Sequence, residues 1–119
     1  MSESILKIKT YKFAIRIVNL YKYLCKEKRD YVISKQILRS GTSIGALNRE
    51  AEFAQSKLDF INKLSIALKE ANETIYWIEL LFETNYITPE MYEGMKRDCE
   101  EIIKMLISSV KTTKSNLNK

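Results

Sequence analysis

Apolar residues recur at alternating intervals of three and four along four stretches of this chain, which is the spacing of one face of an α-helix. The first stretch covers residues 5–28, and the polar residues 26–30 end it. Its predicted core face consists of Tyr11, Ala14, Val18, Tyr21 and Cys25, widened by Ile17 and Leu24. We predict that this face packs inward and that the lysines and arginines outside it form a basic stripe.

The second stretch, residues 31–55, is interrupted by residues with weak helix propensity between Ser40 and Gly45. A glycine inside a helix costs about 1 kcal/mol, so propensity alone predicts a loop there. The apolar spacing nevertheless continues through the weak segment, at Ile33, Ile37, Ser40, Ile44, Leu47 and Ala51. We therefore predict one continuous helix in which Ser40, Gly41 and Gly45 let a neighbouring helix approach closely.

The third and fourth stretches have the clearest boundaries. Ser56 is placed to cap a helix over residues 57–84, with Asp59 near its positive end. The sequence Thr88-Pro89-Glu90 is typical of the start of a helix over residues 89–110. The predicted core face of the third helix is Ile61, Leu64, Leu68, Ala71, Ile75, Ile78 and Phe82, and that of the fourth is Tyr92, Met95, Cys99, Ile102 and Leu106.

Four amphipathic helices joined by short connections predict an all-α fold, an antiparallel up-down-up-down four-helix bundle. Residues 1–110 form its single domain, because 119 residues are too few for two cores. Residues 111–119 are polar and basic, and we expect them to form a flexible tail.

Composition narrows the classes of function. There is no membrane-length apolar run and no signal-peptide profile at the start, so we expect a cytoplasmic protein without membrane contact. Cys25 and Cys99 fall on apolar faces, so we predict that they pack as small hydrophobic residues and remain free thiols in a reducing compartment. Histidine is absent, which removes the common nucleophile pairs and the usual zinc and di-iron sites. We predict no catalytic residues, no metal site and no cofactor.

Charge is distributed unevenly. Residues 1–30 contain eight Lys or Arg and three acids, a net charge of +5, whereas residues 57–110 contain six basic and ten acidic residues, a net charge of −4. A solvated helix face explains such a stripe as well as phosphate contact does. The candidate phosphate contacts are Lys9, Lys12, Arg16, Lys22 and Lys26 on the first helix, with Arg39 and Arg49 as weaker candidates.

The third helix carries more apolar residues than one face needs. Ile66, Tyr76, Trp77 and Leu80 project away from its predicted core face. Tryptophan and tyrosine concentrate in subunit interfaces, so we favour an oligomer interface here over a broadened intramolecular core.

Residues 36–46 (Gln36-Ile37-Leu38-Arg39-Ser40-Gly41-Thr42-Ser43-Ile44-Gly45-Ala46), followed by Glu50, Ser56-Lys57, Asp59-Phe60 and residues 64–73, carry a family resemblance. This block resembles the bacterial four-helix-bundle family encoded by intervening sequences within 23S ribosomal RNA genes. It is also similar to the accessory variability determinant proteins of diversity-generating retroelements. One departure is Leu47-Asn48, where members often have Asn-Ile.

The resemblance implies an antiparallel four-helix bundle that assembles as a homopentamer with a basic surface. For the retroelement members it also implies nucleic-acid binding and partnership with a reverse transcriptase. Our first hypothesis is therefore a non-catalytic homo-oligomer that binds structured RNA or DNA. The alternative is a protein-interaction scaffold, for example a partner of a reverse transcriptase or of a ribosome-related factor, that makes no nucleic-acid contact. An enzyme is the third reading, and the missing histidine and phosphate loop disfavour it.

Overall fold

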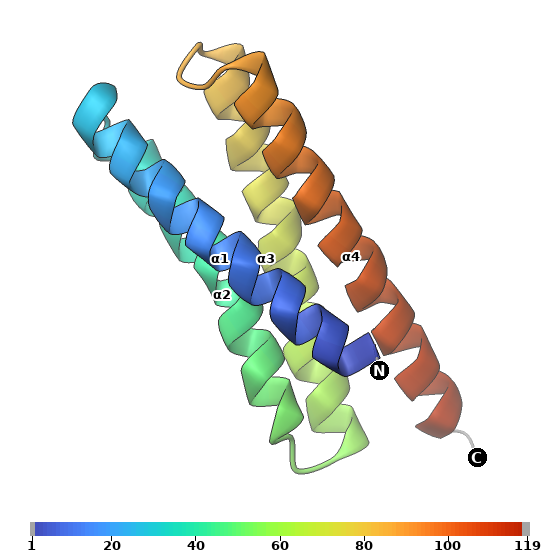
Figure 1. The fold of residues 1–119 in the computed structure, drawn as a ribbon. Helices are drawn as coiled ribbons and strands as arrows, with labels where there is room; N and C mark the ends of the chain where they lie inside the picture. Colours follow the sequence, from blue (N-terminus) through green and yellow to red (C-terminus); the bar gives the residue numbers. More distant parts are fainter. Residues whose placement is uncertain (1, 118–119) are drawn as a thin grey trace.

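The computed structural model describes residues 2–117, with side chains from residue 5 onward. These residues form four helices: α1 (Ser2–Glu27), α2 (Ile33–Glu52), α3 (Lys57–Glu83) and α4 (Pro89–Leu117). Each helix runs antiparallel to the one before it, in a body of 52 × 21 × 20 Å (Figure 1). The predicted all-α bundle is confirmed. Across the described part of the chain, no helix is long and apolar enough to span a membrane.

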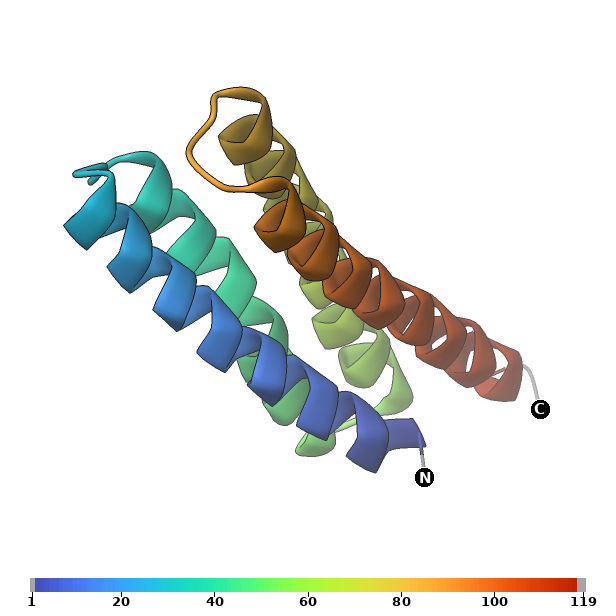
Figure 2. The same ribbon diagram turned by 45° about the horizontal axis from the view of Figure 1, so that its top comes forward.

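The bundle consists of two hairpins, α1–α2 and α3–α4, joined through the α2–α3 contact. Helices α1 and α4 contact each other least of the neighbouring pairs. The α1–α2 turn and the α3–α4 turn lie at the same end of the molecule, and both ribbon views show them apart (Figures 1 and 2). The α1–α4 side is therefore the open side of the bundle.

The predicted faces of α3 and α4 largely form the core. Ile61, Leu64, Ala71 and Ile78 of α3 are buried, as are Met95, Cys99, Ile102 and Leu106 of α4. The remaining predicted residues of α3, Leu68, Ile75 and Phe82, are half-buried and pack against this core. The Phe82 ring stacks on Tyr92 of α4, with ring centroids 4.2 Å apart. The three-and-four spacing thus identified these two helices, but on α3 it missed Ala67, Thr74 and Leu81, which are fully buried.

The weak segment of α2 is helical, as the spacing predicted. A Cβ atom at Gly41 would lie 2.7 Å from the buried Ile17 side chain of α1, and one at Gly45 would lie 3.3 Å from the carbonyl oxygen of Thr10. The missing side chains are what allows α1 to approach this closely. In the next turn of α2, Asn48 rather than the predicted Leu47 is buried, and Leu47 is half-buried.

The predicted core face of α1 is wrong except for Ile17 and Leu24, which are fully buried. The buried face is Leu6, Thr10, Phe13, Ile17, Leu20 and Leu24. Of the predicted residues outside that set, Tyr11 is exposed and Ala14, Val18, Tyr21 and Cys25 are only half-buried. Apolar residues occupy most sides of α1, so two neighbouring lines both satisfy the helical spacing. The line with the larger aliphatic side chains buries more apolar area and packs inward.

The main differences from the predicted boundaries are in three helices, α1, α2 and α4. Helix α2 is shorter than predicted at both ends. Before it, the Asp30 carboxylate accepts a hydrogen bond from the Ser34 amide at 2.7 Å, and after it, residues 53–55 turn the chain towards α3. Helix α1 begins at Ser2 rather than near residue 5. Helix α4 continues to Leu117, so the prediction that it ends near Val110 is wrong.

Residues 111–117 continue α4. Two interactions stabilise this extension: lysines near a helix C-terminus interact favourably with the helix dipole, and Lys57 donates to the Asn116 carbonyl at 3.5 Å. The rest of the predicted tail, residues 118–119, lies outside the described residues. The two predicted caps are confirmed. Ser56 accepts a hydrogen bond from the Asp59 amide at 3.0 Å, and Thr88 accepts one from the Met91 amide at 3.1 Å.

Candidate nucleic-acid interface

Four of the seven basic residues proposed as phosphate contacts already have partners within the chain. On α1, Lys9 pairs with Glu101, and the Arg16 guanidinium donates to Asp98 at 2.6 Å. Both acids come from α4, so the acidic helix neutralises the part of the basic stripe that faces it. These side chains are about half exposed, so each pair is worth about 1 kcal/mol at most and leaves its cation in reach of solvent.

Arg39 is held by α3. Its guanidinium donates to Glu70 at 3.0 Å and to Glu73. These hydrogen bonds raise the pKa of Arg39, and the bond to Glu73 has the larger effect. The Trp77 indole also donates to Glu73, at 2.9 Å. This hydrogen bond lowers the pKa of Glu73; burial of the carboxylate acts in the opposite direction, and the bond from Arg39 lowers the pKa further. Arg39 therefore joins α2 to α3. Arg49 lies over the Tyr11 ring, 5.2 Å from its centroid, in a cation–π contact.

The other three candidates, Lys12, Lys22 and Lys26, are exposed and form no ion pair within the described part of the chain. Two of them, Lys22 and Lys26, lie near further cations around the α1–α2 turn. Sequence reasoning did not select these further cations as candidates. We call this group the tip surface. It consists of Lys22, Lys26, Lys28, Arg29 and Lys35, each of them exposed.

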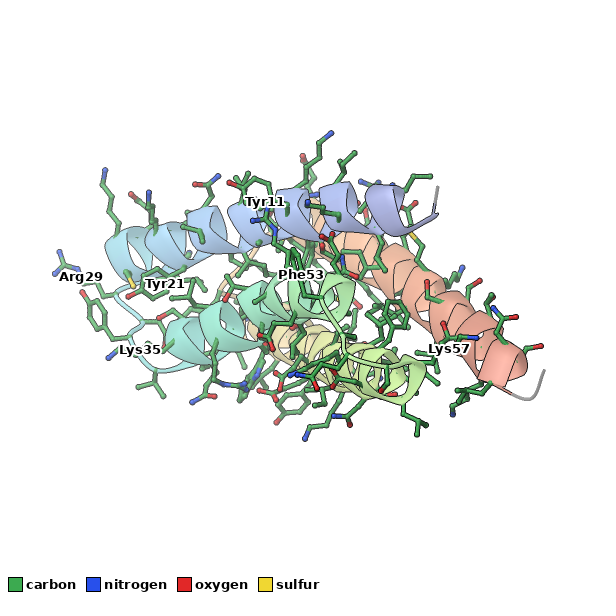
Figure 3. All side chains as sticks on the ribbon, turned by 90° about the horizontal axis from the view of Figure 1, so that it is seen from below. Tyr11, Tyr21, Arg29, Lys35, Phe53 and Lys57 are labelled. Atoms are coloured by element: carbon green, nitrogen blue, oxygen red, sulfur yellow. The ribbon has the colours of Figure 1, made fainter. Side chains whose placement is uncertain are left out.

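The turn that carries the tip surface is held by local hydrogen bonds. Arg29 adopts a left-handed backbone conformation with φ of 51°, which reverses the chain after α1. The Asp30 carboxylate accepts from the Ser34 amide at 2.7 Å, and the Ser34 hydroxyl donates to the Asp30 carbonyl at 2.8 Å. Figure 3 shows Arg29 and Lys35 at this end of the molecule, Arg29 in the turn and Lys35 at the start of α2. The cations thus project from an ordered turn.

The tip surface is electropositive. Residues 22–35 contain five Lys or Arg and two acids, a net charge of +3, and one of the acids, Asp30, is engaged in the turn. Tyr31 is exposed in the same turn and offers an aromatic ring beside the cations. A hydrogen bond with Cys25 raises the pKa of the neighbouring Tyr21 phenol. Clustered cations are the feature through which nucleic-acid-binding proteins contact phosphate groups with little sequence preference, so this group is a candidate site.

A simple signal marks Lys28 and Arg29 in the sequence, because both lie in the connection between α1 and α2, whereas Lys35 lies in the first turn of α2. A cation in a connecting turn has no adjacent helix to supply an acid, so its charge stays available. Cations on a helix can be neutralised by residues far away in sequence, as Lys9 is by Glu101. Position in a turn was therefore more informative than position on the stripe.

Other parts of the described structure offer less chemistry. No three Asp, Glu or Cys side chains among the described residues are grouped so that they could hold a metal ion. Burial raises the pKa of the Cys99 thiol to about 12, which keeps it protonated, and the thiol donates to the Ala71 carbonyl. The open α1–α4 side holds a shallow groove of about 280 Å³ over the Lys9 and Arg16 ion pairs.

The predicted interface residues of α3 divide into two pairs. Ile66 and Tyr76 are exposed. Trp77 and Leu80 are half-buried, and Trp77 packs against the core besides donating to Glu73. Part of this apolar surface, Trp77 and Leu80, is therefore half-buried within the bundle, and the other part, Ile66 and Tyr76, is exposed to solvent.

Comparison with known proteins places this fold in a family. The model of the 23S rRNA-intervening sequence protein family matches residues 3–108. A solved structure from Bacteroides thetaiotaomicron VPI-5482, described as a protein with unknown function from the S23 ribosomal protein family, is 63% identical. The match covers 93% of this chain and 99% of that one, with a TM-score of 0.92. No curated protein shows a significant match. The chain therefore belongs to the 23S rRNA-intervening sequence protein family.

Proposed function

We propose that this protein is a non-catalytic homo-oligomer that binds nucleic acid, either structured RNA or DNA, through its tip surface. The observation that carries the proposal is that its five cations are exposed and form no ion pair within the described residues. Several unpaired cations on one convex turn release counterions when they meet a phosphate backbone, which gives tight but sequence-tolerant binding. Lys12 lies farther along α1 and is not part of this surface.

The family description supports a link to RNA without defining it, because it names the place of the gene rather than a ligand. The charge distribution supports one orientation of the bound molecule. The α3–α4 turn at the same end of the bundle carries Glu79, Glu83, Glu90 and Glu93, with no Lys or Arg between residues 79 and 95. Phosphates are repelled from that hairpin, so the nucleic acid lies against the α1–α2 hairpin.

Fluorescence anisotropy with a structured RNA hairpin and a DNA duplex tests the proposal. We expect binding at low salt, and we expect Lys26→Glu with Arg29→Glu to weaken it by about tenfold or more. The matched control is Lys111→Glu with Lys114→Glu, an equal charge change on exposed residues at the far end of α4. Absence of binding at low salt, or equal losses from both pairs, would contradict the proposal and favour the protein-scaffold alternative.

A further inference from the structure

The turn that carries the tip surface exposes an aromatic and an aliphatic side chain among its cations. Tyr31 is 55% exposed and Val32 is 72% exposed, and both follow Arg29 in the connection from α1 to α2. Within the described part of the chain, the Tyr31 ring contacts no other ring and no cation, unlike Tyr11, which lies under Arg49. The Tyr31 ring is therefore available to a ligand.

Two positions of this turn carry residue types that the local backbone does not favour. Arg29 has φ of 51°, a left-handed conformation that suits glycine or asparagine better, and the left-handed residue of the α3–α4 turn is indeed Asn85. Val32 is the N-cap residue of α2, where a hydroxyl, amide or carboxylate side chain is preferred, and it makes no side-chain cap. Folding alone does not explain these choices, and such departures are typical of functional sites.

Paired and unpaired nucleic acids offer different chemistry to such a turn. In a duplex each base is stacked on its neighbours, so a protein meets phosphates and the edges of bases. In a single strand or a loop the faces of the bases are accessible, and aromatic side chains stack on them while cations contact the backbone. An uncovered tyrosine among unpaired cations matches the second case, whereas cations alone would suit both.

The shape of the tip surface also favours a flexible strand. Its cations come from three elements: Lys22 and Lys26 from α1, Lys28 and Arg29 from the connection, and Lys35 from α2. The connection, residues 28–32, reverses the chain in a narrow convex turn (Figure 2). A duplex is stiff over this length and touches a narrow end at few phosphates, whereas an unpaired strand can bend around it and meet cations of both helices.

We propose that the tip surface recognises unpaired nucleotides, with Tyr31 stacking on a base and the surrounding cations contacting the flanking phosphates. Val32, the next residue, adds apolar area that the same nucleotide can cover. In a structured RNA the bound nucleotides are those of a loop or a bulge rather than of a stem. This inference rests on the proposed nucleic-acid binding and names the form of nucleic acid that the same surface takes.

Anisotropy titrations with two labelled probes at equal salt test this preference: a single-stranded oligothymidylate and a blunt duplex of the same length. We expect the wild type to bind the single strand more tightly, and Tyr31→Ala to weaken that binding by about tenfold with little effect on the duplex. Tyr31→Phe keeps the ring and should keep the affinity, whereas Tyr31→Leu should behave like Tyr31→Ala. The matched control is Tyr76→Ala on α3, where the tyrosine is 57% exposed, and it should change neither affinity.

The salt dependence separates stacking from charge. Stacking releases no counterions, so Tyr31→Ala should keep the wild-type slope of log affinity against log salt. Tighter binding of the duplex, an unchanged single-strand affinity in Tyr31→Ala, or equal losses from Tyr31→Ala and Tyr76→Ala would overturn this inference and leave nucleic-acid binding in place. Absence of binding to both probes at low salt would contradict the proposed function and this inference with it.

Discussion

At the scale of single residues, the close approach of α1 to α2 depends on missing side chains, most of all at Gly41. A Cβ at Gly41 would meet three atoms of Ile17 within 3 Å, and Ile17 is fully buried with no room to move. The same addition at Gly94 would meet only the flexible end of Arg16. These two glycines therefore serve different purposes although both lie inside helices.

We expect Gly41→Ala to destabilise the protein by about 1–3 kcal/mol, because overpacking outweighs the gain in helix propensity. Thermal melting by circular dichroism should show Tm lowered by roughly 5–10 °C. Gly94→Ala is the matched control, and its Tm should be unchanged or slightly raised because Arg16 can rotate away. A Gly41→Ala variant as stable as the wild type would show that the helices are not in tight contact.

The ionised Glu73 carboxylate stabilises the α2–α3 contact through its bonds with Trp77 and Arg39, which lower its pKa. Because the folded pKa lies below the unfolded value, this stability is fully present above the unfolded pKa and is lost as pH falls through the folded one. Glu73→Gln should therefore cost on the order of 1 kcal/mol at pH 7.

Urea titrations at a series of pH values should show that cost shrinking below about pH 4. Glu83→Gln, at an exposed site of the same helix, should cost little at either pH. A Glu73→Gln cost that is the same at pH 7 and pH 3 would exclude stabilisation by the ionised carboxylate.

At the scale of helices, a buried polar contact fixes the register between α2 and α3. The hydroxyls of Ser40 and Thr74 are 2.9 Å apart, both residues are buried, and Thr74 also donates to the Glu70 carbonyl. The small side chain of Ser40 lets α2 and α3 approach closely. The hydrogen bond between Ser40 and Thr74 fixes how the two helices are aligned along their lengths.

Thr74→Val should cost about 1–2 kcal/mol, because the buried Ser40 hydroxyl then loses its partner. Ser40→Ala should cost a similar amount. If the contact is real, the double variant costs less than the sum of the two, and urea unfolding of all four proteins measures the difference. Additive losses would show that the two hydroxyls do not interact.

The success of sequence reasoning differed among the helices for a physical reason. In α4 the apolar residues lie mainly on one side, so the direction of the buried face follows from the spacing, whereas α3 carries apolar residues on a second side and its predicted face missed the buried Ala67, Thr74 and Leu81. In α1, apolar residues surround the helix, and both Tyr11-Ala14-Val18 and Phe13-Ile17-Leu20 fit the period. Only the tertiary partners, α2 and α4, decide which line is buried.

At the scale of the whole molecule, charge placement depends on the fold more than on the sequence. The basic stripe of α1 is visible in the sequence, but the acids that neutralise Lys9 and Arg16 are more than 80 residues away. Which cations remain available is therefore decided by the α1–α4 packing. The same packing leaves the α1–α2 turn apart from the acidic hairpin (Figure 2). The structure thus moves the candidate site from the stripe toward the tip surface.

The salt dependence of nucleic-acid affinity measures the number of phosphates neutralised, and it tests the tip surface most directly. Lys26→Gln with Arg29→Gln should reduce the slope of log affinity against log salt by about 1–2, while Lys111→Gln with Lys114→Gln should leave it unchanged. A slope that is unaffected by the tip pair, or reduced equally by both pairs, would contradict binding at the tip surface.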